Sequence, residues 1–209
     1  MIKSKHIQIV EGALKLFYAQ GFHPTSIREI AESCNMSMGQ LYHYISSKDD
    51  VLYLVHQYFH QLRSDYVKAQ NIEQYATPME RLTKYLAANM FFVSENKKII
   101  QLISTETKYL KKEYLIDVLK MEQEDTIDNY HQLLVDLNKE ISINGDLELL
   151  ASILAYVVAF LALKGWTVKE KSTDDVNCCL FDFIINGLGK SVLQEYEKSK
   201  NNVCLEELP

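Results

Sequence analysis

Apolar residues recur at three- and four-residue steps along most of the chain, which is the period of a helix packed on one side. Residues 4–20 form one such stripe, and Gly21 follows it, as glycine often does just past a helix end. No stretch of useful length alternates apolar and polar residues at the two-residue period of a strand. The pattern therefore predicts an all-α protein. Further helices are expected over residues 78–94, 96–108, 111–141, 147–168 and 174–198.

Three helix-start signals lie close together between residues 26 and 50. A serine at positions 26, 37 and 47 is followed three residues later by Glu, Gln or Asp, the spacing of a capping box. These signals predict short helices over 27–34 and 37–44 and a long helix over 47–68. Together with the helices predicted above, the chain is expected to form about nine. Asn35 stands in the turn between the short helices, where a positive φ is required. A helix, a turn and a second short helix describe a helix-turn-helix, whose second helix enters the major groove of DNA.

The most apolar run covers residues 149–163 and is too short to cross a membrane, which takes about 20 residues. We therefore expect a buried helix there and no membrane partner. The first residues lack the continuous apolar stretch of a signal peptide, so the expected location is cytoplasmic. The four cysteines lack metal-ligand spacing and are expected to be reduced thiols. They are Cys34, Cys178, Cys179 and Cys204.

The net charge of −6 does not by itself suggest a nucleic-acid binder. The charge is uneven, however, because the first 48 residues are close to neutral and the rest of the chain carries the acidic excess. Such an N-terminal module can bind a polyanion only through a small, well-placed patch.

Catalytic motifs are absent from the sequence: it contains no HExxH, no glycine-rich phosphate loop and no GxSxG elbow. His56 and His60 stand four residues apart on one predicted helix, a spacing that can bind a metal. No neighbouring cysteine or carboxylate pattern completes such a site, so a structural or surface role is favoured. We expect no enzyme activity, no metal site and no cofactor.

The N-terminal quarter of the chain resembles a known family. The segments TSIREIA at 25–31, SMGQLY at 37–42 and SKDDVL at 47–52 are similar to the N-terminal domain of the TetR family of bacterial transcriptional regulators. The likeness covers about residues 4–55, with Asn35 in place of the usual turn glycine and Ile45 where an aromatic residue is common. It implies a three-helix DNA-binding domain over residues 1–47 and a helical effector-binding and dimerisation domain over 48–209.

The resemblance also implies the roles of individual residues. The expected phosphate contacts are Ser26, Ser37, Tyr42 and Lys48, joined by Thr25 and Tyr44. The expected groove-lining or base-reading side chains are Arg28, Met38, Gln40 and His43, while Gly39 lets the backbone approach DNA. For Gln40, capping its own helix and contacting a base remain equal alternatives. For Tyr42, we expect a packed ring with its hydroxyl on a phosphate.

The C-terminal helices carry no motif, and large aromatic and methionine side chains at helical spacing are more often core than pocket. The alternative on this composition is an apolar effector cavity between the helices. Asn89, Lys108 and His131 are the candidate polar anchors of such a cavity. The expected lining is Tyr85, Asn89, Phe92, Tyr109, Met121, Tyr130, His131, Tyr156, Phe160 and Trp166.

Dimerisation is expected through the last two predicted helices, because one short recognition helix reads only a few base pairs. These helices are the most apolar and carry small residues that allow close packing. The alternative is that they close the core of the monomer.

These features predict a homodimeric repressor that binds a palindromic operator in double-stranded DNA and is released by a small, largely apolar effector. One alternative is an architectural DNA-binding protein without an effector. The other is a helical small-molecule-binding protein with a vestigial DNA-binding head.

Overall fold

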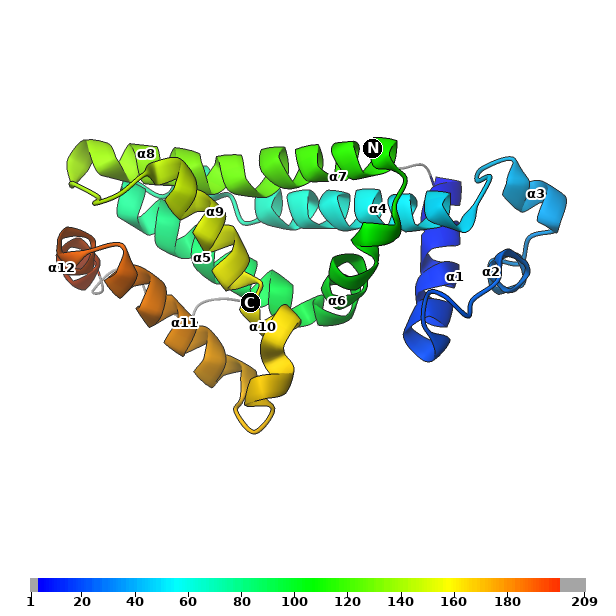
Figure 1. Cartoon of the computed structure of the whole chain (residues 1–209). Helices are drawn as coiled ribbons and strands as arrows, with labels where there is room; N and C mark the ends of the chain where they lie inside the picture. Colours follow the sequence, from blue (N-terminus) through cyan, green and yellow to red (C-terminus); the bar gives the residue numbers. More distant parts are fainter. Residues whose placement is uncertain (1–3, 200–209) are drawn as a thin grey trace. The chain divides into compact units, whose positions relative to one another are not determined.

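The computed structural model describes residues 4–199, and throughout that range the chain is helical, without a strand (Figure 1). The prediction of an all-α protein is confirmed. The chain divides into two compact units: Met1–Arg63 with Lys98–Glu122, and Ser64–Lys97 with Gln123–Pro209. This division cuts the long helix at Arg63, whereas the functional boundary expected at residues 47/48 stays a prediction.

The first unit begins with the expected three-helix head and continues into longer helices. Its elements are α1 (Ser4–Gln20), α2 (Ile27–Ser33), α3 (Met38–Tyr42), the first part of α4 (Lys48–Ala69), α6 (Lys97–Glu106), the 3₁₀ turn η2 (Thr107–Tyr109) and α7 (Lys112–Glu122). Within this unit α7 runs beside the first turns of α4 (Figure 1), where Tyr53 and Tyr114 stack with ring centroids 4.3 Å apart.

The core of the head depends on a close approach of α1 to the end of α2. A Cβ at Gly12 would lie 2.5 Å from Cys34 Sγ, so this position requires glycine. The Ser33 hydroxyl donates to the Gly12 carbonyl oxygen at 3.0 Å, and the Gln8 side-chain amide donates to the Cys34 carbonyl oxygen at 2.7 Å. Leu41 of α3 is fully buried and anchors the second short helix.

The second unit is built around α5, in which every residue from 82 to 90 is buried. A Thr77–Glu80 capping box and Pro78 begin this helix, and α8 packs against both α5 and α9. The elements are η1 (Ile72–Gln74), α5 (Pro78–Glu95), the π-helical turn η3 (Gln123–Ile127), α8 (Asp128–Glu140), α9 (Leu147–Val158), α10 (Phe160–Lys164), η4 (Gly165–Val168), α11 (Thr173–Gly187) and α12 (Lys190–Ser199).

The described residues form α-helices α1 to α12, more than the nine or so expected, because three predicted helices are interrupted. A π-helical turn interrupts 111–141 at residues 123–127. The helix over 147–168 bends at Ala159, and the helix over 174–198 ends at Gly187 and restarts at Lys190. Gly189 has a φ of 113°, which an ordinary helix cannot accommodate.

Within residues 4–199, no single helix has the length and apolar character needed to cross a membrane. Leu147–Val158 and Phe160–Val168, bent by 47°, reach that length and composition only when taken together.

Candidate nucleic-acid interface

Capping boxes begin both short helices of the head, as predicted. Ser26 Oγ accepts from the Glu29 N–H at 3.2 Å, while the Glu29 carboxylate accepts from the Ser26 N–H at 2.7 Å. Ser37 and Gln40 make the same reciprocal pair at 3.2 and 2.8 Å. The N-terminal N–H groups of α2 and α3 are thereby satisfied locally, which fixes where each helix starts.

The turn between α2 and α3 requires a left-handed residue. Asn35 adopts a φ of 54°, a conformation that asparagine tolerates better than most residues. The Met36 N–H then donates to the Ala31 carbonyl oxygen at 2.9 Å, which closes the turn. Asn35 therefore fills the position where the family usually has glycine.

Regular α-helix in the expected recognition helix ends at Tyr42, earlier than Tyr44. The next N–H groups still bond backward: Tyr44 donates to the Leu41 carbonyl oxygen at 2.9 Å and Ile45 to the same oxygen at 3.2 Å. The segment thus tightens into a last turn, which presents Tyr42, His43 and Tyr44 to solvent while Leu41 and Ile45 are buried.

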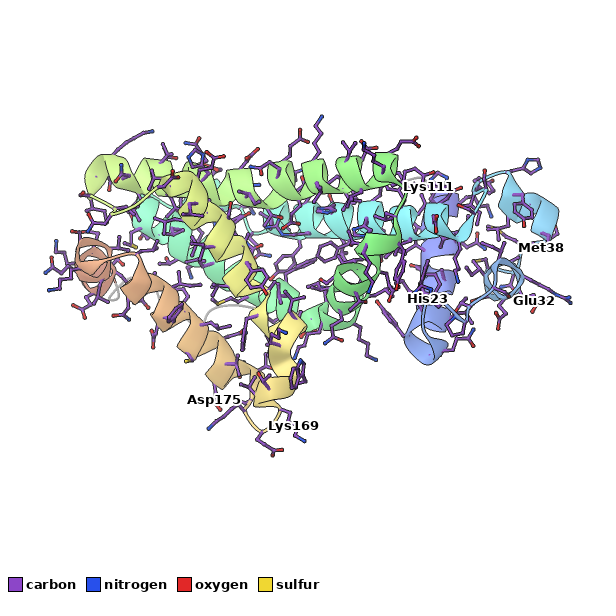
Figure 2. The ribbon with its side chains drawn as sticks, viewed as in Figure 1. His23, Glu32, Met38, Lys111, Lys169 and Asp175 are labelled. Carbon is purple, nitrogen blue, oxygen red and sulfur yellow. The ribbon has the colours of Figure 1, made fainter. Side chains whose placement is uncertain are left out.

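The exposed surface of this head contains most of the expected DNA-contact residues (Figure 2 labels Met38 and Glu32). Tyr42 is 52% exposed, and Met38 is half-buried. At Gly39 a Cβ would meet nothing within 4 Å, so the backbone of α3 is accessible there. The other exposed members of the set are Ser26, Arg28, Ser37, Gln40, His43 and Tyr44.

Several of these side chains already have intramolecular partners. Thr25 is buried, and its hydroxyl donates to the Gly21 carbonyl oxygen at 2.8 Å. Arg28 Nε lies 2.9 Å from Glu32 Oε1 in an exposed ion pair. The Gln40 amide oxygen caps α3, which is one of the two roles left open for this residue. Glu29 accepts hydrogen bonds from the Ser26 hydroxyl and N–H and from Gln20, and these lower its pKa to about 2.

Lys48 contacts the head rather than reaching into solvent. Its Nζ donates to the carbonyl oxygens of Phe22, His23 and Thr25 at 2.8, 2.8 and 3.0 Å. These bonds can use all three ammonium protons, and the ammonium also lies 4.6 Å from the centre of the Phe22 ring. Burial lowers the pKa of Lys48, and the nearby carboxylates of Asp49 and Glu106 partly offset this lowering. Lys48 therefore ties the start of α4 to the turn between α1 and α2.

A second set of contacts joins the start of α4 to the start of α7. Asp50 accepts hydrogen bonds from the Ser46 N–H at 2.6 Å and from the Tyr114 hydroxyl at 2.8 Å, and Lys111 Nζ lies 3.3 Å away. Burial opposes ionisation of Asp50, but these bonds prevail and lower its pKa to about 2. The bond to Asp50 and burial raise the pKa of Tyr114 to about 12.

His23 links the head to the α6–α7 corner. Its Nε2 lies 3.2 Å from Glu106 Oε2, and its ring packs edge-on against Tyr109 with centroids 4.5 Å apart. Together with the contacts of Lys48 and Asp50, it joins the head to the start of α4 and to residues 106–114.

The expected effector-pocket residues are divided between the two units. Tyr85, Asn89 and Phe92 of α5 and Tyr130 of α8 are buried in the second unit. Tyr85 and Tyr130 pack edge-to-face with centroids 4.9 Å apart, and the Asn89 amide donates to the Tyr85 carbonyl oxygen at 2.7 Å. All four residues therefore belong to the interior of the second unit, where Tyr85 and Tyr130 are in contact.

The remaining pocket candidates lie closer to the surface or in the other unit. Tyr156 of α9 and Trp166 of η4 are 66% and 71% exposed. Tyr109 is also exposed and, like the half-buried Met121, belongs to the first unit. His131 and Phe160 of the second unit are half-buried.

His56 and His60 are buried, so the expectation of a surface role is wrong while a structural one stands. Among residues 4–199 no group of three potential metal-binding side chains occurs. Burial lowers the pKa of both imidazoles to about 4, with further contributions from His60 to His56 and from Arg63 to His60. Both histidines are therefore neutral near pH 7.

The cysteines in the described part of the chain are free thiols. Cys34 is buried, which raises its pKa, and Cys178 and Cys179 are exposed on α11. Cys204 lies outside the described residues.

Three functional candidates were missed from the sequence: Asp50 as a contact to α7, Tyr114 as its partner, and Thr107 as the partner of His56. The capping signal at Asp50 was visible, but its partners lie about 60 residues away, beyond the reach of any local pattern.

Comparison with known proteins supports the assignment of the head. Residues 9–53 match the sequence model of bacterial regulatory proteins of the tetR family. The transcriptional regulator HbdR of Aromatoleum sp. (strain CIB) is 31% identical over 111 residues, which are 53% of this chain and 48% of HbdR. YuxN of Bacillus subtilis (strain 168), an uncharacterised regulator of the helix-turn-helix type, is 25% identical over 193 residues, or 90% of this chain and 66% of YuxN. The chain thus spans about half to two thirds of the length of these relatives.

Solved structures show that the likeness of fold extends over nearly the whole chain. A regulatory protein of the tetR family from Rhodococcus RHA1 superposes with a TM-score of 0.73 at 16% identity, over 90% of this chain and 98% of that one. AibR, solved with isovaleryl coenzyme A and operator DNA, superposes with a TM-score of 0.70 at 20% identity, over 86% and 97%. The head of this chain is thus a DNA-binding domain of the tetR family, and the fold of the chain is shared with solved regulatory proteins of that family.

Proposed function

We propose that this protein is a ligand-responsive repressor that binds a palindromic operator as a homodimer and leaves it when a small, largely apolar effector binds. Residues 1–47 would read DNA, and residues 48–209 would bind the effector and dimerise. A regulator of this kind needs a recognition surface, a site for the effector and a connection between them.

The exposed end of α3 is the observation that carries the DNA-binding part. Tyr42, His43 and Tyr44 face solvent beside the accessible backbone of Gly39, while Leu41 holds the same helix in the core. Hydroxyl and imidazole groups can donate to phosphate oxygens, and the short helix fits the major groove. Lys48 would act by holding the head in place, because its ammonium already has three carbonyl partners.

The connection between effector and DNA would run through α4. Lys48 and Asp50 in its first turn bond to the head and to α7, respectively. An effector that binds more tightly to a conformation with shifted α4 helices would change the spacing of the two recognition helices. That difference in affinity would move the population of the protein off its operator.

Effector binding is supported by the family fold and by one structural relative. AibR was solved with isovaleryl coenzyme A and operator DNA, so a protein of this fold binds both.

Dimerisation is supported by apolar side chains on the surface of the second unit. Leu149, Ile153 and Tyr156 follow one another at helical spacing on α9, and all three are exposed. Phe183 of α11, a helix in contact with α9, is 65% exposed. Contiguous exposed apolar residues of this size favour an interface between subunits.

Selection of genomic fragments by the purified protein tests the proposal. Wild type is expected to enrich a palindromic site. Tyr42→Phe is expected to weaken binding to that site by about tenfold to a hundredfold, because each of the two subunits loses one phosphate hydrogen bond. Tyr75→Phe removes a hydroxyl from a half-buried tyrosine just after η1, outside the head and outside the proposed dimer interface, and is expected to bind the site like wild type.

Salt-sensitive retention of all fragments without a preferred site would refute sequence recognition and favour an architectural protein. Retention of no fragments at all would favour the vestigial head. An enriched site bound equally well by Tyr42→Phe would remove Tyr42 from the phosphate contacts.

A further inference from the structure

His56 contains a buried nitrogen that accepts no hydrogen bond from the described residues 4–199. The side chain lies on the inner side of α4 with an exposed fraction of 2%, and Nδ1 has no partner there. Buried polar atoms are nearly always hydrogen-bonded, because losing water without a replacement costs free energy. His56 Nδ1 is therefore a buried acceptor that the described side chains and backbone leave open to a hydrogen-bond donor.

The neighbouring Thr107 determines which nitrogen of His56 carries the proton. The Thr107 hydroxyl donates to the Ile103 carbonyl oxygen, since a carbonyl oxygen has no proton to share. The same hydroxyl oxygen lies 3.2 Å from His56 Nε2 and must therefore accept there. Nε2 carries the proton, and Nδ1 presents a lone pair.

The surroundings also keep the imidazole uncharged. Burial and the neighbouring His60 lower the pKa of His56 to about 4, and Arg63 acts in the same direction on His60. His56, His60 and Arg63 stand at i, i+4 and i+7 of α4, all on one buried side. A lone pair on a neutral, fixed imidazole selects a hydrogen-bond donor.

We propose that the effector site includes His56 and that the effector places an uncharged hydrogen-bond donor, such as a hydroxyl or amide N–H, against Nδ1. The inference rests on the proposed function and names the chemistry of the ligand at one point of its site. A carboxylate would face a lone pair instead and could bind there only by bringing a proton. Thr107 acts as a positioning residue, because it fixes the tautomer.

This location also suits the transmission of a signal. His56 follows Asp50 by six residues on α4, and Thr107 precedes Tyr114 by seven residues in the segment that continues into α7. Asp50 and Tyr114 form the hydrogen bond that joins these two helices at 2.8 Å. A ligand at His56 Nδ1 would therefore act on the two segments whose contact positions the head.

The test uses three probes of similar size: phenol as a neutral donor, anisole without a donor and benzoate as an anion. Full-length protein labelled with ¹⁵N-histidine reports the tautomer and the hydrogen bonding of His56 directly. Without a probe, His56 should be the Nε2–H tautomer. Phenol should shift the Nδ1 resonance in the direction of an accepted hydrogen bond, and anisole should not.

Two variants then separate chemistry from packing. His56→Phe is expected to weaken phenol binding about tenfold and to leave anisole binding unchanged, the value of one hydrogen bond. His56→Gln keeps one donor and one acceptor and should retain phenol binding. Thr107→Val should release the tautomer, so that Nδ1–H is populated. If His56→Phe does not fold, the wild-type spectra still show whether Nδ1 accepts a hydrogen bond from phenol. The Thr107→Val spectrum still shows whether Thr107 fixes the tautomer.

Three results would overturn the inference: an Nδ1 resonance unmoved by phenol up to its solubility limit, equal phenol affinity in His56→Phe and wild type, or protonation of His56 by bound benzoate. Operator binding is measured on the same samples. Absence of any operator would refute the proposed function, whereas the response of Nδ1 to phenol would still be read independently.

Discussion

The stability of the protein should fall steeply between pH 7 and pH 4 because of His56 and His60. Each has a pKa of about 4 in the folded protein against an ordinary value of 6.5. Between these two pKa values the histidines are protonated in the unfolded chain and neutral in the folded protein. The free energy of unfolding therefore decreases as the pH falls below about 6.5, and the loss is complete below about pH 4.

The difference between the folded and unfolded pKa values corresponds to roughly 3 kcal/mol of unfolding free energy for each histidine. About 2 kcal/mol of this contribution is lost by pH 5. The carboxylates with lowered pKa act in a different range. Asp50 and Glu29 have pKa values of about 2, so their contributions are lost only below their ordinary values of 3.8 and 4.5. Between pH 7 and pH 5 the two imidazoles should therefore dominate.

Urea unfolding followed by far-ultraviolet circular dichroism at pH 7, 6 and 5 measures this effect, at one fixed protein concentration because an oligomer would shift the midpoint. The matched control is the double variant His56→Gln, His60→Gln, which cannot titrate at these positions. Its midpoint should change little over the same range. Equal losses in wild type and in the double variant would refute the reasoning, because the protons would then be taken up elsewhere.

Four further changes test the packing and the assembly. Gly12→Ala should cost about 1–3 kcal/mol of unfolding free energy, because its Cβ would lie 2.5 Å from Cys34 Sγ; an unchanged urea midpoint would contradict that contact. Asn35→Ala should cost about 1 kcal/mol at its φ of 54°, and Asn35→Gly should not. Lys48→Met should lower the melting temperature and weaken operator binding; weakened operator binding at an unchanged melting temperature would instead indicate a direct phosphate contact. Phe183→Asp should convert the proposed dimer to monomers in sedimentation velocity, and a persisting dimer would place the interface elsewhere.

Signals that act within one turn of the chain were sufficient to identify the head. The Ser26–Glu29 and Ser37–Gln40 pairs begin α2 and α3 where the sequence predicted, because a capping box is closed by residues three positions apart. Asn35 marked the turn for the same local reason. The all-α class followed from the period of the apolar residues alone.

Interruptions of the long helices were not predicted. The bend at Ala159 and the π-helical turn at 123–127 occur inside stretches whose apolar period continues without a break. Periodicity reports which side of a segment is apolar, and that information is the same for one straight helix or two bent ones. Among the three interruptions, only the one between α11 and α12 is marked in the sequence, by Gly189, whose φ is 113°.

The sequence by itself determined the class of fold, the helix-turn-helix and the family resemblance of the head, because each depends on residues that are neighbours in the chain. Tertiary structure decided what individual side chains do. Lys48 resembles a phosphate contact by its motif, yet its ammonium is bonded to three carbonyl oxygens more than 20 residues away. His56 resembles half of a metal site by its spacing, yet burial and Thr107 make it a neutral acceptor. Partners and solvent access depend on which distant segments fold against a residue, and no local pattern contains that information.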